Sequence, residues 1–215
     1  MDDHEVETHV HRGMTITIYH DQDAESPRDW DNFGEMYCVI NRDYVLGDHQ
    51  VNLEHYDSWE QIVEEMVADH GATVVLPLDV HDNWQPSMSI GQVPDDLWGD
   101  RIEGWVCDDK AKRKELGFTE RDHFGRNGLC DEFVVQLLKG EVETYSRYMS
   151  GEVYGYVVTD EDGIDYGSCW GFYGTEDALH EARAEADYAA DKVKEALDVR
   201  MAEEAEASVT YAWNG

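Results

Sequence analysis

The loop after the first apolar segment is where this chain could hold a metal ion. Asp21, Asp29 and Asp31 crowd into it, together with His20 and Asp23. Carboxylate oxygens are the ligands that Mg²⁺ and Mn²⁺ take, and a bound divalent ion can promote hydrolysis of a phosphoester. The same side chains also form Asx turns and helix caps, and most stretches of so acidic a chain look similar. A divalent metal site at Asp21, Asp29 and Asp31 and a purely local structural role are both open interpretations.

Arg28, Trp30 and Asn32 lie in the same loop. A planar guanidinium near an indole is either a stacked structural pin or an exposed recognition pair. We favour the structural pin, and we keep these three residues as candidate interaction residues.

The stretch Gly167-Ser168-Cys169-Trp170-Gly171 has the letter pattern of a nucleophile elbow, with Cys169 as the nucleophile. An elbow needs a helix that starts at once, whereas Phe172–Gly174 intervene before Thr175 can cap one. The pattern therefore favours a closely packed strand of a sheet over a catalytic cysteine.

Asp160, Asp162 and Asp165 surround Gly163 and invite a calcium interpretation, because carboxylates at alternate positions suit that ion. The terminal Glu of an EF-hand loop is missing at the required spacing. The Asp162-Gly163 pair is instead typical of a hairpin turn.

Lys110, Lys112, Arg113 and Lys114 form the one basic cluster of the sequence. On a short helix they could grip an anion, but a solvated face paired with neighbouring acids is favoured. His9 and His11 could pick up a transition metal adventitiously, and we assign them no role. Gly-rich phosphate loops, paired zinc cysteines and the His-Glu-x-x-His motif are absent from the sequence, which weakens the case for an enzyme. We expect no catalytic residues and no cofactor, with the divalent metal as the alternative.

The charge of the chain limits its partners. The sequence has 49 acidic residues against 16 Lys and Arg, a formal net charge of -33. A surface at negative potential repels polyphosphates, so direct binding of nucleic acid is not expected. Self-repulsion of this size weakens a fold, and three explanations are open: a high-salt habitat, a basic partner, or carboxylates that hold metal.

The environment of the chain is expected to be the cytoplasm. Its four cysteines, Cys38, Cys107, Cys130 and Cys169, show no paired spacing, and the acidic amino terminus has no apolar leader. No apolar run approaches the roughly 18 residues of a membrane span.

The order of the expected elements predicts an α+β fold, with a mostly antiparallel or mixed sheet and packed helices in a single domain. Residues 1–13 are expected to form a disordered tail rich in acids and His, residues 14–207 the domain, and residues 208–215 a C-terminal tail. The expected strands are Met14–Tyr19, Glu35–Ile40, Thr73–Val80, Arg101–Cys107, Val153–Thr159 and Asp165–Phe172. The expected helices begin at the Ser58-x-x-Gln61 capping box, at Asp108, at Asp131 and at Thr175. The expected core contains Trp59, Ile62, Val75, Leu76, Val142, Tyr145, Tyr156 and Leu179.

Three stretches carry a family resemblance. They are Ser26–Gly34 with Met36 and Cys38, then Trp98-Gly99 with Gly104-Trp105-Val106, and then Gly140–Gly174, which includes Ser168-Cys169-Trp170-Gly171-Phe172-Tyr173-Gly174. From about Met14 to Asp187 the chain resembles a group of uncharacterised proteins carried by bacteriophages, plasmids and other mobile elements. The resemblance implies an accessory role inside a host cell and no particular reaction.

These observations lead to one leading hypothesis and two alternatives. The leading hypothesis is a non-enzymatic protein that binds a basic host protein, such as a defence nuclease or another DNA-binding factor, in its strongest form as a mimic of DNA. The carboxylates proposed for this surface lie along the last expected helix, at Asp177, Glu181, Glu185, Asp191, Glu195 and Asp198. The alternatives are a divalent-metal-dependent phosphoester hydrolase and a salt-adapted protein whose acidity only solvates its surface.

Overall fold

A computed structural model describes residues 4–39, 45–81, 86–92, 103–116 and 131–213. Its helices and its mostly antiparallel or mixed sheets confirm the predicted α+β class. The chain divides into two compact units, one formed by residues 1–24 and 152–215 and the other by residues 25–151. This division was not predicted from the sequence.

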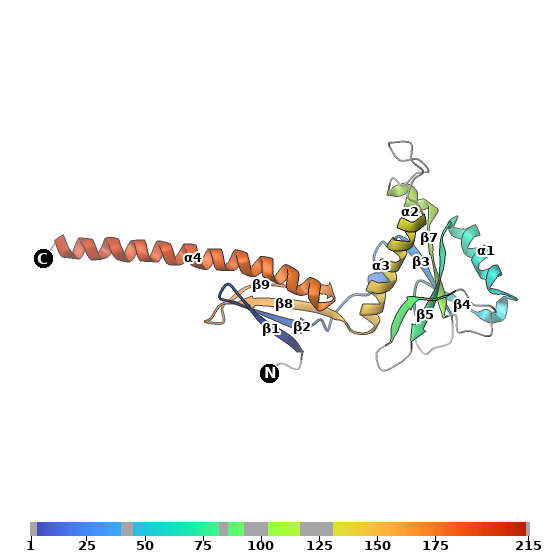
Figure 1. The fold of residues 1–215 in the computed structure, drawn as a ribbon, viewed down its shortest axis with the longest axis horizontal. Helices are drawn as coiled ribbons and strands as arrows, with labels where there is room; N and C mark the ends of the chain where they lie inside the picture. The colour runs from blue at the N-terminus through green and yellow to red at the C-terminus, as the bar shows by residue number, and fades with distance from the viewer. Residues whose placement is uncertain (1–3, 40–44, 82–85, 93–102, 117–130, 214–215) are drawn as a thin grey trace. The chain divides into compact units, whose positions relative to one another are not determined.

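The first unit is a four-stranded antiparallel sheet with a helix on one face (Figure 1). Its strands are β1 (Glu5–His11), β2 (Met14–His20), β8 (Val153–Thr159) and β9 (Asp165–Tyr173), in that spatial order. Helix α4 (Thr175–Trp213) packs on the sheet through small residues. The core between them contains Met14, Ile16, Ile18, Tyr154, Tyr156, Val158, Ala178, Ala182, Ala186 and Ala189.

Strand β1 corrects the prediction of a disordered tail over residues 1–13. Arg12 and Gly13 both have positive φ, 51° and 84°, which is the backbone of a type I′ hairpin turn. The turn sets β1 in register with β2, and Thr8 pairs with Thr17. Little of β1 is buried, so its stability comes from main-chain pairing, a source that hydrophobic patterning does not detect. Arg12 also reaches α4, 2.6 Å from Asp191.

The second unit has a five-stranded mixed sheet in the order β4-β3-β7-β5-β6. The strands are β3 (Gly34–Val39), β4 (His49–Val51), β5 (Val75–His81), β6 (Ser87–Ile90) and β7 (Gly104–Asp108). The β3–β4 pair is parallel and the other pairs are antiparallel. The short strands β4 and β6 were not predicted.

Helices cover both faces of this second sheet. Helix α3 (Asp131–Met149) packs on one face around Met36, Leu78 and Val106, and α1 (Trp59–His70) packs on the other around Trp105 and Cys107. The short elements are α2 (Lys110–Glu115) and the 3₁₀ turns η1 (Pro27–Asp29) and η2 (Leu53–His55). A sheet buried on both faces explains why β7 is buried along its whole length.

Most predicted elements are confirmed, with small differences at their ends. The bounds of α3 and β8 are those expected from the sequence, and α1 ends at Gly71 in the left-handed conformation (φ 62°). The capping box has a different form from that predicted, because Ser58 makes no side-chain cap bond and Gln61 accepts from the amide of Asp57, one residue before the N-cap. Asp109, not Asp108, caps α2, and α4 runs to Trp213, through most of the predicted C-terminal tail.

The predicted core is partly confirmed. Ile62, Val142, Tyr145 and Tyr156 are buried. Trp59, Val75, Leu76 and Leu179 are only partly buried, at the margins of the clusters. Trp98, Gly99, Arg101, Gly117 and Cys130 lie outside the described residues.

The ordered state of β1 can be tested by hydrogen exchange. We expect the paired amides within Glu5–His11 to exchange at least about 10-fold more slowly than in an unstructured peptide. Gly13→Val should speed this exchange, because Val resists positive φ, whereas Gly13→Asn should largely preserve it. Free-peptide rates over residues 5–11 in the unmodified chain would contradict the strand.

Candidate functional site

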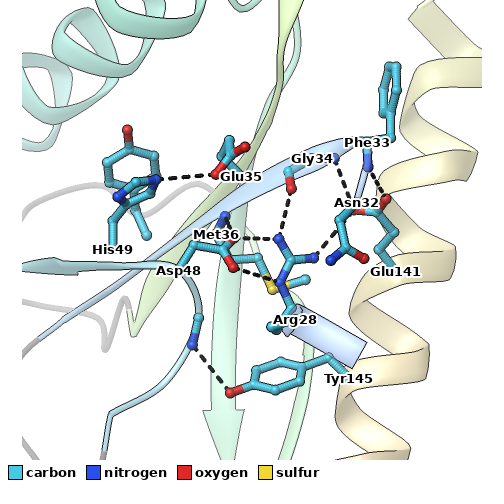
Figure 2. A network of polar contacts seen from close by, with 12 residues as sticks. Arg28, Asn32, Phe33, Gly34, Glu35, Met36, Asp48, His49, Glu141 and Tyr145 are labelled. Carbon is cyan, nitrogen blue, oxygen red and sulfur yellow. Dashed lines mark hydrogen bonds and ion pairs between the residues drawn. The ribbon is translucent and has the colours of Figure 1, made fainter. Parts of the chain in front are cut away.

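Arg28 occupies a buried polar junction in the second unit (Figure 2). Its side chain is only 7% exposed. The guanidinium forms an ion pair with Asp48, donates to the Gly34 carbonyl at 2.8 Å, and lies 3.4 Å from Glu141 of α3. Because every side of the guanidinium meets an acceptor of the chain itself, Arg28 stabilises the fold through ion pairs and hydrogen bonds.

The two carboxylates of this junction also bind backbone amides. Glu141 accepts from the amides of Phe33 at 2.5 Å and Gly34 at 3.0 Å, and Asp48 accepts from the amide of Met36 at 2.7 Å. Burial raises the pKa of Glu141, and the two amides and Arg28 limit that rise. The junction thus fastens the first residues of β3 to α3 and to the segment that carries Asp48 (Figure 2).

The other two candidate residues of this loop, Asn32 and Trp30, differ in their surroundings. The Asn32 amide donates to the carbonyls of Pro27 at 2.8 Å and Trp30 at 3.0 Å, so it closes its own loop. Trp30 is 49% exposed. Of the three candidate interaction residues, Trp30 is therefore the one whose side chain is substantially presented to solvent.

The three carboxylates proposed for a metal are not brought together within either unit. Asp21 follows β2 in the first unit and accepts from the Asp23 amide, as an Asx turn would. Asp29 is in η1 and Asp31 follows it, both in the second unit, and the Asp31 side chain is 88% exposed. Over the described ranges, no group of three His, Cys, Asp or Glu side chains is arranged to hold a metal ion.

The cysteine pattern lies on a strand and the calcium pattern forms a hairpin turn, but the strand is not closely packed at Cys169, whose side chain is exposed. Gly167–Gly171 lies inside β9, so Cys169 is on a strand and not on a strand-to-helix turn. Asp160 accepts from the amides of Asp162 and Ile164, which forms the β8–β9 hairpin turn.

A polar chain crosses the second unit from β3 through the end of α1 to the start of α2. The Tyr37 hydroxyl lies 2.6 Å from His70 Nε2, and His70 Nδ1 lies 2.9 Å from Asp109. His49 stacks on Tyr37 and lies 3.2 Å from Glu35. Sequence analysis missed this set, because its members are separated by other elements and no motif joins them.

The pKa shifts within this hydrogen-bonded set argue against Tyr37 as a nucleophile. Burial, together with nearby acids, raises the pKa of Tyr37, so its hydroxyl stays protonated and donates to His70. Although burial opposes it, hydrogen bonds from His70 and from the α2 amides lower the pKa of Asp109. Asp109 thus remains an acceptor that orients His70 and caps α2, and the Tyr37–His70–Asp109 chain joins three elements.

The basic cluster is largely paired with acids, as expected. Lys112 lies 3.0 Å from Glu35 and 3.9 Å from Asp31. Arg113 Nε lies 2.6 Å from the fully buried carboxylate of Asp108, close enough for a strong ion pair although the approach is poorly aligned for a hydrogen bond. These bases therefore neutralise acids of their own unit.

Helix α4 carries the predicted acidic residues on its exposed side. Asp177, Glu181, Asp191, Glu195 and Asp198 are exposed, and Glu185 is partly buried. The buried alanines Ala178, Ala182, Ala186 and Ala189 face the sheet, opposite Asp191 and Asp198, whereas Glu185 borders the alanine face and lies over Gly167 of β9. Two of the acids have basic partners, since Arg12 lies 2.6 Å from Asp191 and Lys192 lies 3.4 Å from Glu195.

Comparison of the chain with protein-family models, with curated proteins and with solved structures gives no match. The resemblance to mobile-element proteins therefore stays an expectation from the sequence. Across the described residues, no helix combines the length and apolarity needed to cross a membrane.

The importance of the Arg28 junction can be measured by denaturation. Arg28→Ala should lower the free energy of unfolding by about 3 kcal/mol, because it leaves the buried carboxylates of Asp48 and Glu141 without their cation. The control is Arg200→Ala, since Arg200 is 71% exposed and pairs only with Glu204, and its cost should stay below about 0.5 kcal/mol. Equal costs for the two variants would show that the junction is not a structural support.

Proposed function

We propose that this chain is a non-enzymatic accessory protein of a virus or mobile element, which binds a basic host protein through the acidic side of α4. The observation that carries the proposal is a series of mostly exposed carboxylates along one long helix, outside the alanine face that packs on the sheet. The helix has eleven Asp and Glu residues and four Lys and Arg residues. A potential of this sign steers a chain toward cationic surfaces and raises the rate of association.

The geometry of α4 bears on the stronger hypothesis of DNA mimicry. From Asp177 to Asp198 the helix rises about 32 Å, close to one turn of B-DNA, which is about 34 Å. Six carboxylates over that length give one charge per roughly 5 to 6 Å, whereas a duplex carries one per about 1.7 Å and each strand one per about 3.4 Å. Because Arg12 and Lys192 pair with two of the six, the net charge density of the α4 row is below that of one strand and well short of a duplex.

That comparison selects the class of partner. For a protein that contacts both strands of DNA, α4 offers about a third of the charge density of the duplex. For a basic cleft or helix that contacts one strand, the charge density of α4 is closer to that of the natural ligand. We therefore propose a DNA-binding or defence protein that engages α4 as it would a single backbone.

The proposal is tested by removing the carboxylates as amides. In the test variant, Asp177, Glu181, Glu185, Asp191, Glu195 and Asp198 become Asn or Gln. In the control variant, the same charge is removed from exposed acids outside α4, at Asp23, Glu54, Asp57, Glu64, Asp69 and Glu132. The unmodified chain and each variant are immobilised and incubated with a host lysate free of nucleic acid, with and without an excess of duplex or single-stranded DNA.

We expect the unmodified chain and the control to retain DNA-binding proteins that added DNA releases, and the test variant to bind them at least about 10-fold more weakly. Circular dichroism checks that both variants keep their helix content. Equal retention by the two variants, or retained proteins that DNA does not release, would overturn the proposal.

Salt adaptation is a second candidate, because most of the 49 acids lie outside α4. If the acidity is an adaptation of the whole surface, screening of the self-repulsion should raise the melting temperature between 0.1 M and 2 M KCl. We expect a rise of more than about 5 °C for both the unmodified chain and Trp30→Ser, which leaves the charge unchanged. A flat or falling melting temperature would remove this explanation. The hydrolase alternative has no supporting observation among the described residues.

A further inference from the structure

The first unit has a second sheet face, on the side away from α4. Met14, Ile16 and Ile18 of β2 contact α4, so alternation places Thr15, Thr17 and Tyr19 on the opposite side. We call this opposite side the outer face. Its central part consists of Thr15, Thr17, Tyr19, Val157, Ser168 and Trp170.

The central part of the outer face carries no charged side chain, in a chain where 30% of residues are charged. Glu5 and Asp165 are the nearest acids in the register, and both stand at the ends of the edge strands. On β1 the Thr8 hydroxyl donates to the Glu5 carboxylate at 3.0 Å, so the neutral surface continues on this strand mainly through Val10, whose side chain is 76% exposed. Solvation of an acidic surface does not explain a neutral face of this extent.

An aromatic platform lies on this face. The Trp170 indole packs directly on Gly155, where a Cβ would lie only 2.1 Å from the ring, and its centroid is 6.2 Å from that of Tyr19. Trp170 nevertheless stays 48% exposed. A large, flat aromatic surface on a neutral sheet is typical of a protein interface, where Trp and Tyr are enriched.

The negative charge of the chain indicates which kind of partner could bind the outer face. A basic partner is better matched by the acids of α4, and it would lose their attraction on a neutral face. Two copies of this chain repel each other except where they meet through uncharged surface. When two outer faces stack as a sandwich, the sheets lie about 10 Å apart and each α4 lies on the far side of its own sheet.

The distance between the two α4 helices of such a dimer determines how strongly their acidic residues repel each other. With a helix of about 10 Å diameter beyond each sheet, the two α4 axes lie roughly 30 Å apart. This is several times the Debye length of about 8 Å at physiological salt, so the acidic rows would be largely screened from each other. We propose that the outer face binds the outer face of a second copy of this chain.

The size of the face predicts the strength of this pairing. Four strands paired over about seven residues span about 23 Å by 19 Å, a footprint of roughly 440 Å², which is below the roughly 800 Å² per partner of a standard interface. The dimer should therefore be weak, with a dissociation constant of tens of micromolar. Residual repulsion between the copies should make it tighten as salt rises.

The test is sedimentation velocity on the full chain, from 5 to 200 µM and in 0.05 M and 0.5 M KCl. We expect a concentration-dependent dimer that is at least about 3-fold tighter at the higher salt. Val10→Glu adds a carboxylate at an exposed position of the outer face, where folding is not at risk, and should weaken the dimer at least about 10-fold. Trp170→Ala should also weaken it.

The matched control is Met201→Glu, which adds the same charge on α4 at a side chain that is 66% exposed. It should leave the dimer as it is. A monomer at every concentration and salt, or a dimer that Met201→Glu weakens and Val10→Glu does not, would overturn the inference. The result is independent of partner binding through α4, because the two surfaces lie on opposite sides of the sheet.

Discussion

The burial of one cation organises the second unit. Arg28 is enclosed by Asp48, Glu141 and the Gly34 carbonyl, and the same carboxylates hold the amides at the start of β3. A buried guanidinium is costly to desolvate, and it is tolerated only when charged and polar acceptors surround it closely. Here they come from three separate segments, so the cation is satisfied only when β3, the Asp48 segment and α3 come together. This requirement makes the arrangement specific in a way that the apolar contacts of Met36 and Leu138 alone would not.

The scarcity of bases links this interior to the surface. Several of the 16 Lys and Arg residues hold parts of the fold together, as Arg12, Arg28, Lys112 and Arg113 do. Arg28, Lys112 and Arg113 pair with acids of the second unit, and of these four bases only Arg12 pairs with α4, which keeps a large excess of negative charge. In the first unit the result is a sheet with two unlike sides, an acidic helix over one and a neutral outer face on the other. Each side suits a different kind of partner for the same electrostatic reason.

Sequence patterns predicted the elements that bury a regular apolar stripe, and missed those that do not. Helix α3 and strand β8 had the expected bounds, because periodic residues such as Val134, Leu138 and Val158 meet a core. Strand β1 is mostly exposed and is fixed by its turn and its pairing with β2. The two units escaped prediction because β2 pairs with β8, more than 130 residues later, as the register Thr15 to Thr159 shows. The partners of Arg28 lie 20 and 113 residues away, and no local motif encodes such a contact.

The far part of α4 raises the question of what keeps it helical beyond the sheet that it covers (Figure 1). Every described side chain from Lys194 to Ala205 is exposed, so tertiary packing does not support it. Leu197 and Met201 are four residues apart and share one face of the helix, whereas Val199 lies on another, so these side chains do not form the repeating seam of a coiled coil. Support comes from within, through the strong helix propensity of Ala and Glu and through i,i+4 pairs such as Arg200 with Glu204, each worth about 0.3 to 0.5 kcal/mol. A helix stabilised in this way leaves its charged side chains exposed to solvent, which is compatible with the binding role that we propose for α4.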